Sequence, residues 1–147
     1  MIQTIKSLFT RDLYRLKREI ELYQDEANLW IADRAITNPA GNLCLHLVGN
    51  LNTYIGAVLG HTGYIRHREL EFSLRNVPRS ELLQKVDETL QVVLHSLDQM
   101  QEEQLQEEYP LLVFDEKTST EYFLIHLTTH LTYHLGQINY HRRLLDL

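Results

Sequence analysis

Four of the eight histidines lie in the last helical stretch of the chain, where their spacing suits metal binding. His126, His130 and His134 follow one another at intervals of four residues. At about 100° per residue, such positions lie one helical turn apart and form a column. Two imidazoles at this spacing can bind one metal ion from consecutive turns. A bare pair also occurs by chance, so a third ligand has to come from another part of the chain.

An earlier helical stretch offers that third ligand. His46 lies at the border of an apolar stripe, with Asn42, Asn50 and Thr53 on nearly the same line. A column of small polar groups inside a bundle is costly unless it lines a wet or metal-bearing pocket. The alternative is that His46 is a core-edge residue bonded to a neighbour. Together the two columns favour a site in which His46 joins the histidines of the last stretch.

The other histidines and the single cysteine have a simpler interpretation. Cys44 lies two residues from His46, and therefore about 160° away around a helix. It cannot share a metal ion with His46 and is expected to be a small core residue. His61, His67 and His95 are expected on the surface or in loops.

Apolar residues recur every three or four positions in four stretches, which predicts four amphipathic helices. Asn38 and Pro39 are expected to open the second helix, as N-cap and first helical residue. Thr118 to Glu121 form a capping-box pattern at the start of the fourth. The expected ranges are 2–23, 38–60, 80–100 and 118–145.

Two connections stand out between these helices. Residues 62–79 are long and charged, with Arg66, Arg68, Glu69 and Glu71, and so long a connection usually forms a crossover or the wall of a site. The apolar segment 109–114 is expected to fold back over one end of the core. Four helices of this length predict an all-α four-helix bundle, with residues 1–147 as one domain.

Composition excludes several classes of protein. The chain has 147 residues, with 14 basic and 20 acidic side chains and a net charge of −6, which disfavours binding to nucleic acid. There is no run of about 18 apolar residues to span a membrane, and the N-terminus lacks the apolar stretch of a signal peptide. One cysteine excludes an internal disulfide and suits a reducing compartment, so we expect a cytoplasmic protein.

The last histidine motif resembles that of a known family. His130-Leu-Thr-Tyr-His134-Leu-Gly136-Gln137 resembles the H-x-x-x-H-x-G-Q signature that closes the DinB-like (YfiT-like) superfamily. Segments 38–51 and 64–72 resemble an uncharacterised bacterial branch of it. The resemblance implies an up-down-down-up bundle in which the long second connection is the crossover. It also implies a divalent metal ion, zinc or nickel, bound by His46, His130 and His134.

The resemblance leaves other residues around the expected metal with lesser roles. His126 has no place among the implied ligands and is expected to line the pocket or contact a ligand. Asn50 and Gln137 lie on the two histidine strips and are candidates to orient the ligands, or else they form an inter-helix hydrogen bond. Tyr133 replaces a histidine found in many relatives, so no proton-transfer role is carried over to it. The family also implies a homodimer, for which the expected contacts are Leu29, Ile31, Ile55 and Leu124.

Three imidazoles leave an open coordination position, as in catalytic metal sites. Such a metal lowers the pKa of a bound water or thiol and makes it a nucleophile. Relatives in the superfamily include S-transferases that use bacillithiol, mycothiol or glutathione, so a low-molecular-weight thiol and an electrophile are the expected substrates. Arg66 or Arg68 would hold the carboxylates of the thiol, or form surface ion pairs. The alternatives are a metal-dependent hydrolase, for which no carboxylate occurs at ligand spacing, and a non-catalytic metal-binding stress protein.

Overall fold

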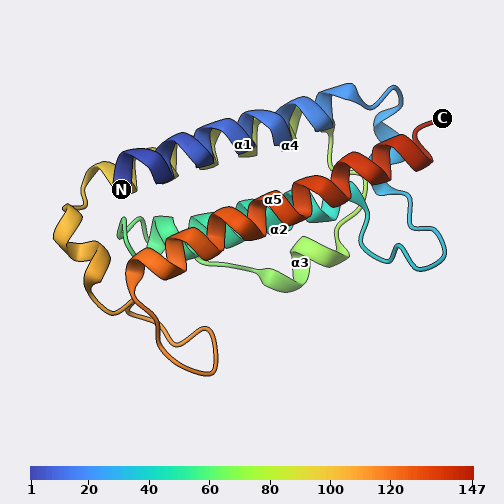
Figure 1. Ribbon diagram of the computed structural model, residues 1–147. Coiled ribbons are helices and arrows are strands. Elements are labelled where there is room, and N and C mark those ends of the chain that lie inside the picture. The colour runs from blue at the N-terminus through green and yellow to red at the C-terminus, as the bar shows by residue number, and fades with distance from the viewer.

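The computed structural model describes residues 1–147 and is built from helices. Four long helices form the body of the molecule, and one short helix lies in the connection between the second and third of them (Figure 1). Short 3-10 turns span Glu26–Trp30 and Glu102–Gln106. The helices are α1 (Ile2–Leu22), α2 (Ala40–Leu51), α3 (Arg68–Ser73), α4 (Arg79–Asp98) and α5 (Thr120–Leu145).

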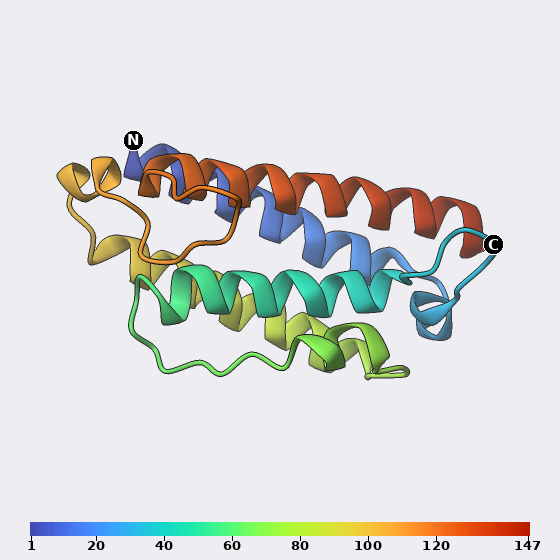
Figure 2. The same cartoon turned by 90° about the horizontal axis from the view of Figure 1, so that it is seen from below.

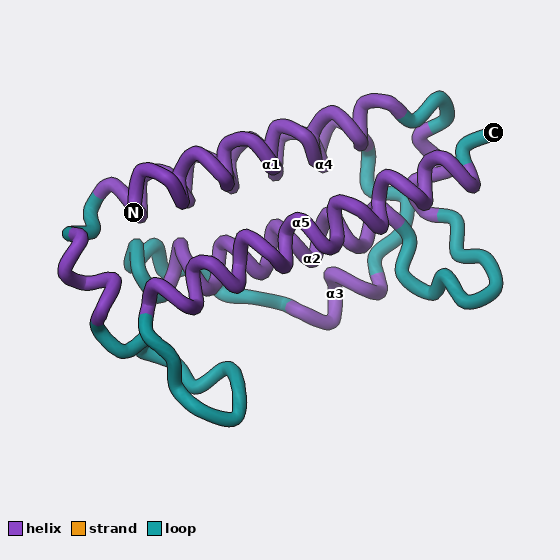
Figure 3. The backbone as a smooth tube through the Cα atoms, viewed as in Figure 1, coloured by secondary structure: helices purple, strands orange, loops and turns teal.

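The topology is up-down-down-up, as predicted. α1 and α5 run in one direction and α2 and α4 in the other, so the connection between α2 and α4 returns along the whole bundle (Figures 1 and 2). Figure 3 shows this connection as an extended loop that ends in α3. α1 packs on α4 and α5, and α2 packs on the same two helices. α2 and α5, which carry the candidate ligands, are therefore neighbours.

The predicted apolar stripes form the core. On α1, Ile5, Phe9 and Leu13 are buried, and the same face continues to Ile20. Twenty-nine buried apolar residues make one continuous cluster to which all four long helices contribute. No helix is both long enough and apolar enough to cross a membrane.

Two helix starts differ from the sequence prediction. α2 begins at Ala40, with Pro39 at the N-cap position and no side-chain cap, so Asn38 lies outside the helix. α5 is capped by Ser119, whose hydroxyl accepts a hydrogen bond from the amide of Tyr122, so the predicted capping box is not formed. Both shifts are small because the apolar periodicity locates a helix better than its exact end.

The predicted second helix also changes character before Gly60. Beyond Leu51 the chain forms a π-helical turn, Asn52–Ala57, where the amides of Val58 and Gly60 bond the carbonyls of Thr53 and Ile55, five residues back. The side chain of Thr53 donates to the carbonyl of Gly49, and that of Asn52 donates to the carbonyl of Val48. Because side chains bond these carbonyls, the last turns widen.

The segment 109–114 covers the core only through its ends. Tyr109 is fully buried, stacks on Phe123 with ring centroids 4.0 Å apart and donates to the carbonyl of Tyr54. Phe114 packs against the same cluster. Between them, Leu112 is 63% exposed, so the middle of the segment does not cover the core.

The residues predicted to form a dimer contact lie elsewhere. Leu29, Ile55 and Leu124 are fully buried in the core of a single chain, and Ile31 is half-buried. The prediction was wrong for Leu29, Ile55 and Leu124, because each of them packs in the core cluster of its own chain. Any dimer has to use other side chains.

One buried polar contact joins the C-terminal end of α5 to α1. His141 is buried, and its Nδ1 lies 2.6 Å from the hydroxyl of Tyr23, while its Nε2 lies 2.8 Å from the carbonyl of Ile31. Since a carbonyl only accepts, Nε2 carries the proton and the Tyr23 hydroxyl donates to Nδ1. Burial lowers the pKa of His141, which keeps the ring neutral in this role.

Replacing Tyr23 by Phe is expected to lower the free energy of unfolding by about 1–3 kcal/mol, because it leaves Nδ1 of His141 buried without a donor. The ring volume is preserved, so packing is not the cause. Tyr14→Phe is the control, since Tyr14 is 58% exposed on the same helix. Denaturant unfolding of both variants measures the difference, and equal stabilities would refute this role for Tyr23.

Candidate metal centre

Three histidines from two helices converge at the middle of the bundle. Nε2 of His46, on α2, lies 3.3 Å from Nε2 of His130, on α5, and Nε2 of His134 lies 3.1 Å from that same nitrogen. One ring nitrogen from each residue lies within 4.8 Å of the other two. His46 is buried, and the other two are half-buried. The helix pairing thus brings together the three residues that the sequence and the resemblance singled out.

Hydrogen bonds on the opposite side of two rings determine their tautomers. Nδ1 of His46 lies 3.0 Å from a carboxylate oxygen of Glu71, which can only accept, so this nitrogen carries the proton. Nδ1 of His134 lies 2.7 Å from Oε1 of Gln137 and donates to it. Both rings therefore present an unprotonated Nε2 to His130.

This arrangement fits a divalent cation. Unprotonated nitrogens at such short separations repel one another unless a positive charge lies between them. A neutral His130 has one ring proton, so it can donate to only one of the other two nitrogens. Imidazole nitrogens bind zinc at about 2.0–2.1 Å, which puts two ligands of a tetrahedral ion about 3.3 Å apart. The observed Nε2–Nε2 separations of 3.1 and 3.3 Å match that ligand–ligand distance. The donor set is thus suited to zinc and to other divalent ions that accept imidazole.

Protons compete weakly for these nitrogens at neutral pH. Burial, aided by the neighbouring histidines, lowers the pKa of His130 to about 4. Burial also lowers the pKa of His134. Because metal ligands must be neutral imidazoles, both rings are ready to bind an ion near pH 7 without losing a proton first.

Glu71 is a site residue that sequence reasoning missed. It comes from α3, in the crossover, and is buried against α2 with only 6% of its surface exposed. Arg66 holds the carboxylate with two hydrogen bonds of 2.8 Å, from Nε and Nη2. The sequence showed Glu71 only as a charge in a long connection, and it offered Arg66 either as a holder of the thiol's carboxylates or as a surface ion pair. The length of that connection was the one signal that it formed part of a site.

The predicted supporting residues have different positions. Gln137 contacts His134, as described above. Asn50 is buried, but its side-chain oxygen has no hydrogen-bond partner and it does not bond any of the three histidines. His126 lies outside the cluster and packs its ring on Phe114 at 4.7 Å between centroids. Its contact with His130 is ring stacking, with the ring centroids 6.1 Å apart.

The residues expected to be uninvolved remain apart from the centre. Cys44 is fully buried, and burial raises the pKa of its thiol to about 12. A buried, protonated thiol does not bind a metal. His61, His67 and His95 are exposed.

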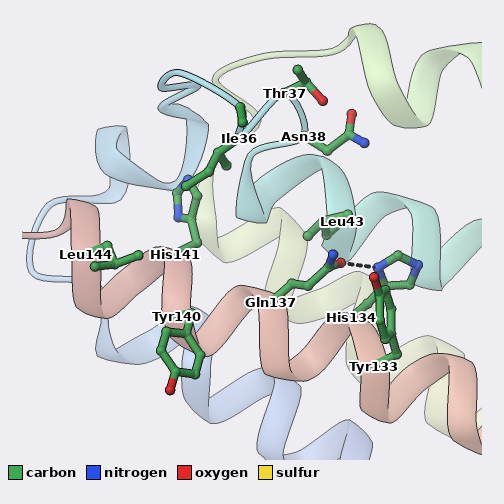
Figure 4. A pocket seen from close by; sticks show the side chains of 11 residues that line it. Ile36, Thr37, Asn38, Leu43, Tyr133, His134, Gln137, Tyr140, His141 and Leu144 are labelled. Atoms are coloured by element: carbon green, nitrogen blue, oxygen red, sulfur yellow. Dashed lines mark hydrogen bonds between the residues drawn. The ribbon is translucent and has the colours of Figure 1, made fainter.

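A pocket opens beside His134, between α5 and the segment that leads into α2. Its volume is about 480 Å³. Figure 4 shows Gln137 bonded to His134 in the wall of this pocket, with Leu43 of α2 nearby. The lining includes no Lys, Arg, Asp or Glu. It consists of Ala35, Ile36, Thr37, Asn38, Leu43, Tyr133, His134, Gln137, Tyr140, His141 and Leu144.

Among solved structures, the chain is similar to one described as a conserved protein of locus from Enterococcus faecalis. The TM-score is 0.76 at 20% sequence identity, over 99% of this chain and 96% of that one. At this identity the likeness supports the fold alone. A comparison with curated proteins finds no match.

The match to a family model extends over nearly the entire chain. The model is described as a protein of unknown function, DUF1572, and it matches residues 2–146, which include all five helices and the three converging histidines. The chain therefore belongs to the DUF1572 family.

Proposed function

We propose that this chain is a DinB-like, divalent-metal-dependent enzyme that transfers a low-molecular-weight thiol to an electrophile in stress or detoxification. His46, His130 and His134 would bind the ion, zinc or nickel. The observation that carries the proposal is the convergence of three ring nitrogens within 4.8 Å, with Nε2 of His130 at 3.3 and 3.1 Å from Nε2 of His46 and His134, whose protons are held on Nδ1 by their hydrogen-bond partners. The three-histidine set leaves a coordination position for a substrate.

The bound ion would supply one chemical function, which is to lower the pKa of a coordinated thiol. The chain supplies the rest. Gln137 orients His134 through its hydrogen bond and lines the pocket at the same time. The pocket next to His134 would bind the electrophile within reach of the centre.

The position of Glu71 favours thiol transfer over hydrolysis. A metal-dependent hydrolase needs a general base near the attacking water. Glu71 bonds the far side of His46, and Arg66 occupies both of its oxygens, so it is not available as a base. The pocket lining holds no other carboxylate. A thiol with a lowered pKa needs no such base.

The lining also suggests the class of electrophile. Apolar side chains, tyrosines and neutral amides favour an uncharged, partly apolar molecule. The proposal assigns neither Arg66 nor Arg68 to the carboxylates of the thiol, because Arg66 is bonded to Glu71 and the guanidinium of Arg68 lies over the ring of Phe72 at 5.2 Å.

The first test is metal content. The purified protein is expected to hold one divalent ion per chain, and His130→Ala is expected to lose it, because two imidazoles remain where three are needed. The helical content should persist, since His130 is only half-buried and lies outside the core cluster. Elemental analysis and circular dichroism measure both effects, with His95→Ala as the control on exposed surface. Full metal retention by His130→Ala would overturn the ligand assignment.

The second test is turnover. The metallated protein is expected to consume bacillithiol, mycothiol or glutathione when mixed with an uncharged aromatic electrophile. Gln137→Ala should lower the rate about 10–100-fold, because residues that orient a ligand typically have effects of that size. Gln84→Ala, exposed on α4, is the control. If the fully metallated protein consumes none of the three thiols, the transferase proposal fails and passive metal binding replaces it.

The proposal includes a homodimer. Tyr122 and Ile125, which are exposed near the start of α5 and lie outside the pocket, are the apolar side chains that would meet a second copy. Sedimentation velocity at micromolar concentration is expected to show a dimer. A monomer would remove this part of the proposal and leave the metal centre untouched.

A further inference from the structure

We infer that Glu71 is a positioning residue for the metal centre, and that the crossover exists in part to deliver it to His46. The inference rests on the proposed metal site, but it concerns a residue outside the three ligands. Glu71 would hold His46 in the tautomer that points a lone pair at the ion, and it would raise the affinity of the site for metal.

Toward His46, the Glu71 carboxylate can act only as a hydrogen-bond acceptor. Oε1 lies 3.0 Å from Nδ1 of His46 and 2.8 Å from Nη2 of Arg66, and Oε2 lies 2.8 Å from Nε of Arg66. An ionised carboxylate accepts at each contact, so the histidine proton is held on Nδ1. Arg66 compensates the buried charge through its two hydrogen bonds to the carboxylate, and its Nη2 lies farther from Nδ1 of His46, at 3.3 Å. Carboxylate bonds of this kind orient metal-binding histidines and make them better ligands.

Gly49 provides the space for this carboxylate. A Cβ atom at Gly49 would lie 1.9 Å from Oε2 of Glu71 and 2.6 Å from its carboxyl carbon. Glycine inside a helix destabilises it relative to alanine. Its presence one turn beyond His46 is explained by the close approach of Glu71 to the backbone of α2.

α3 has docking contacts to α2 that do not involve the Glu71 side chain. The side-chain amide of Asn42, on α2, donates to the carbonyls of Glu71 and Leu74, and its oxygen accepts from Arg75. The ring of Phe72 packs at 5.0 Å from that of His46. These contacts dock α3 through its main chain and a neighbouring side chain. The Glu71 carboxylate is therefore free to act on His46, and it can be altered with α3 still docked.

Two substitutions test the inference by different routes. Glu71→Gln removes the negative charge. It also leaves a single acceptor oxygen for the three N–H groups, one of His46 and two of Arg66, that contact the carboxylate. Gly49→Ala keeps the carboxylate but displaces it from His46, and it favours the helix. The matched controls are Glu69→Gln, exposed on α3, and Gly136→Ala on α5, where an added Cβ meets nothing within 4 Å.

The measurements are the zinc dissociation constant, by competition with a chelator, and the tautomer of His46 in the metal-free protein, by ¹⁵N NMR of the imidazoles. In the unaltered protein His46 is expected to carry its proton on Nδ1. Both test variants should shift the proton toward Nε2 and weaken zinc binding about 10–100-fold. The controls should match the unaltered protein in both measurements.

The outcomes separate this inference from the proposed function. If the unaltered protein binds zinc and the folded test variants bind it equally well with an unchanged tautomer, Glu71 only docks the crossover and the inference is wrong. If the unaltered protein binds no zinc, the metal site itself is refuted, and the inference falls with it. Circular dichroism confirms that each variant is folded before either result is accepted.

Discussion

The hydrogen bond between Glu71 and His46 is the contact on which the centre of this molecule depends. A carboxylate buried in a helix bundle is tolerated only when it is paired and fully bonded. Arg66 and His46 together meet that requirement, and Gly49 leaves the room for it. The same bond that satisfies Glu71 turns the lone pair of His46 inward. The need to satisfy a buried charge and the need to orient a ligand are thus met by one contact.

The chain path makes this contact possible. In an up-down-down-up bundle the second connection must travel the full length of the molecule, because α4 starts at the end where α2 started (Figure 2). That path takes the crossover along the outside of α2, on the side opposite α5. α2 therefore has α5 on one side, with His130 and His134, and α3 on the other, with Glu71. His46 lies between the two histidines of α5 and the carboxylate of Glu71 because α2 lies between α5 and α3.

The two sides of the centre differ in chemistry. The side of His46 that faces the crossover is charged, buried and fully bonded. The side of His134 that faces the pocket is lined by apolar, hydroxyl and amide groups without a formal charge. In the proposed metal site, Glu71 and Arg66 would support the His46 ligand from behind, and shape and apolar contact in the pocket would select the substrate. Rigid support of the ligands is a general requirement of catalytic metal sites.

Much of this arrangement could be predicted from the sequence, because it follows from periodicity. The stripes of α1 and α5, the four helices and the histidine column all depend on residues three or four apart, and local geometry relates such residues directly. The pairing of His46 with the column was suggested by the polar residues beside His46 and by the resemblance, and the structure brings the three rings together. The roles of Glu71, Arg66 and Gly49 could not be predicted, since Glu71 and Arg66 meet His46 across 25 and 20 positions of the chain, and Gly49 meets Glu71, only after α3 docks on α2. Asn50 lies on the expected strip, yet it makes no bond to the ligands, because helical spacing determines which face a residue occupies and not which partner the fold places opposite it. Spacing along one helix is thus a property of the sequence, whereas contact between segments was decided by the packing of the crossover against the bundle.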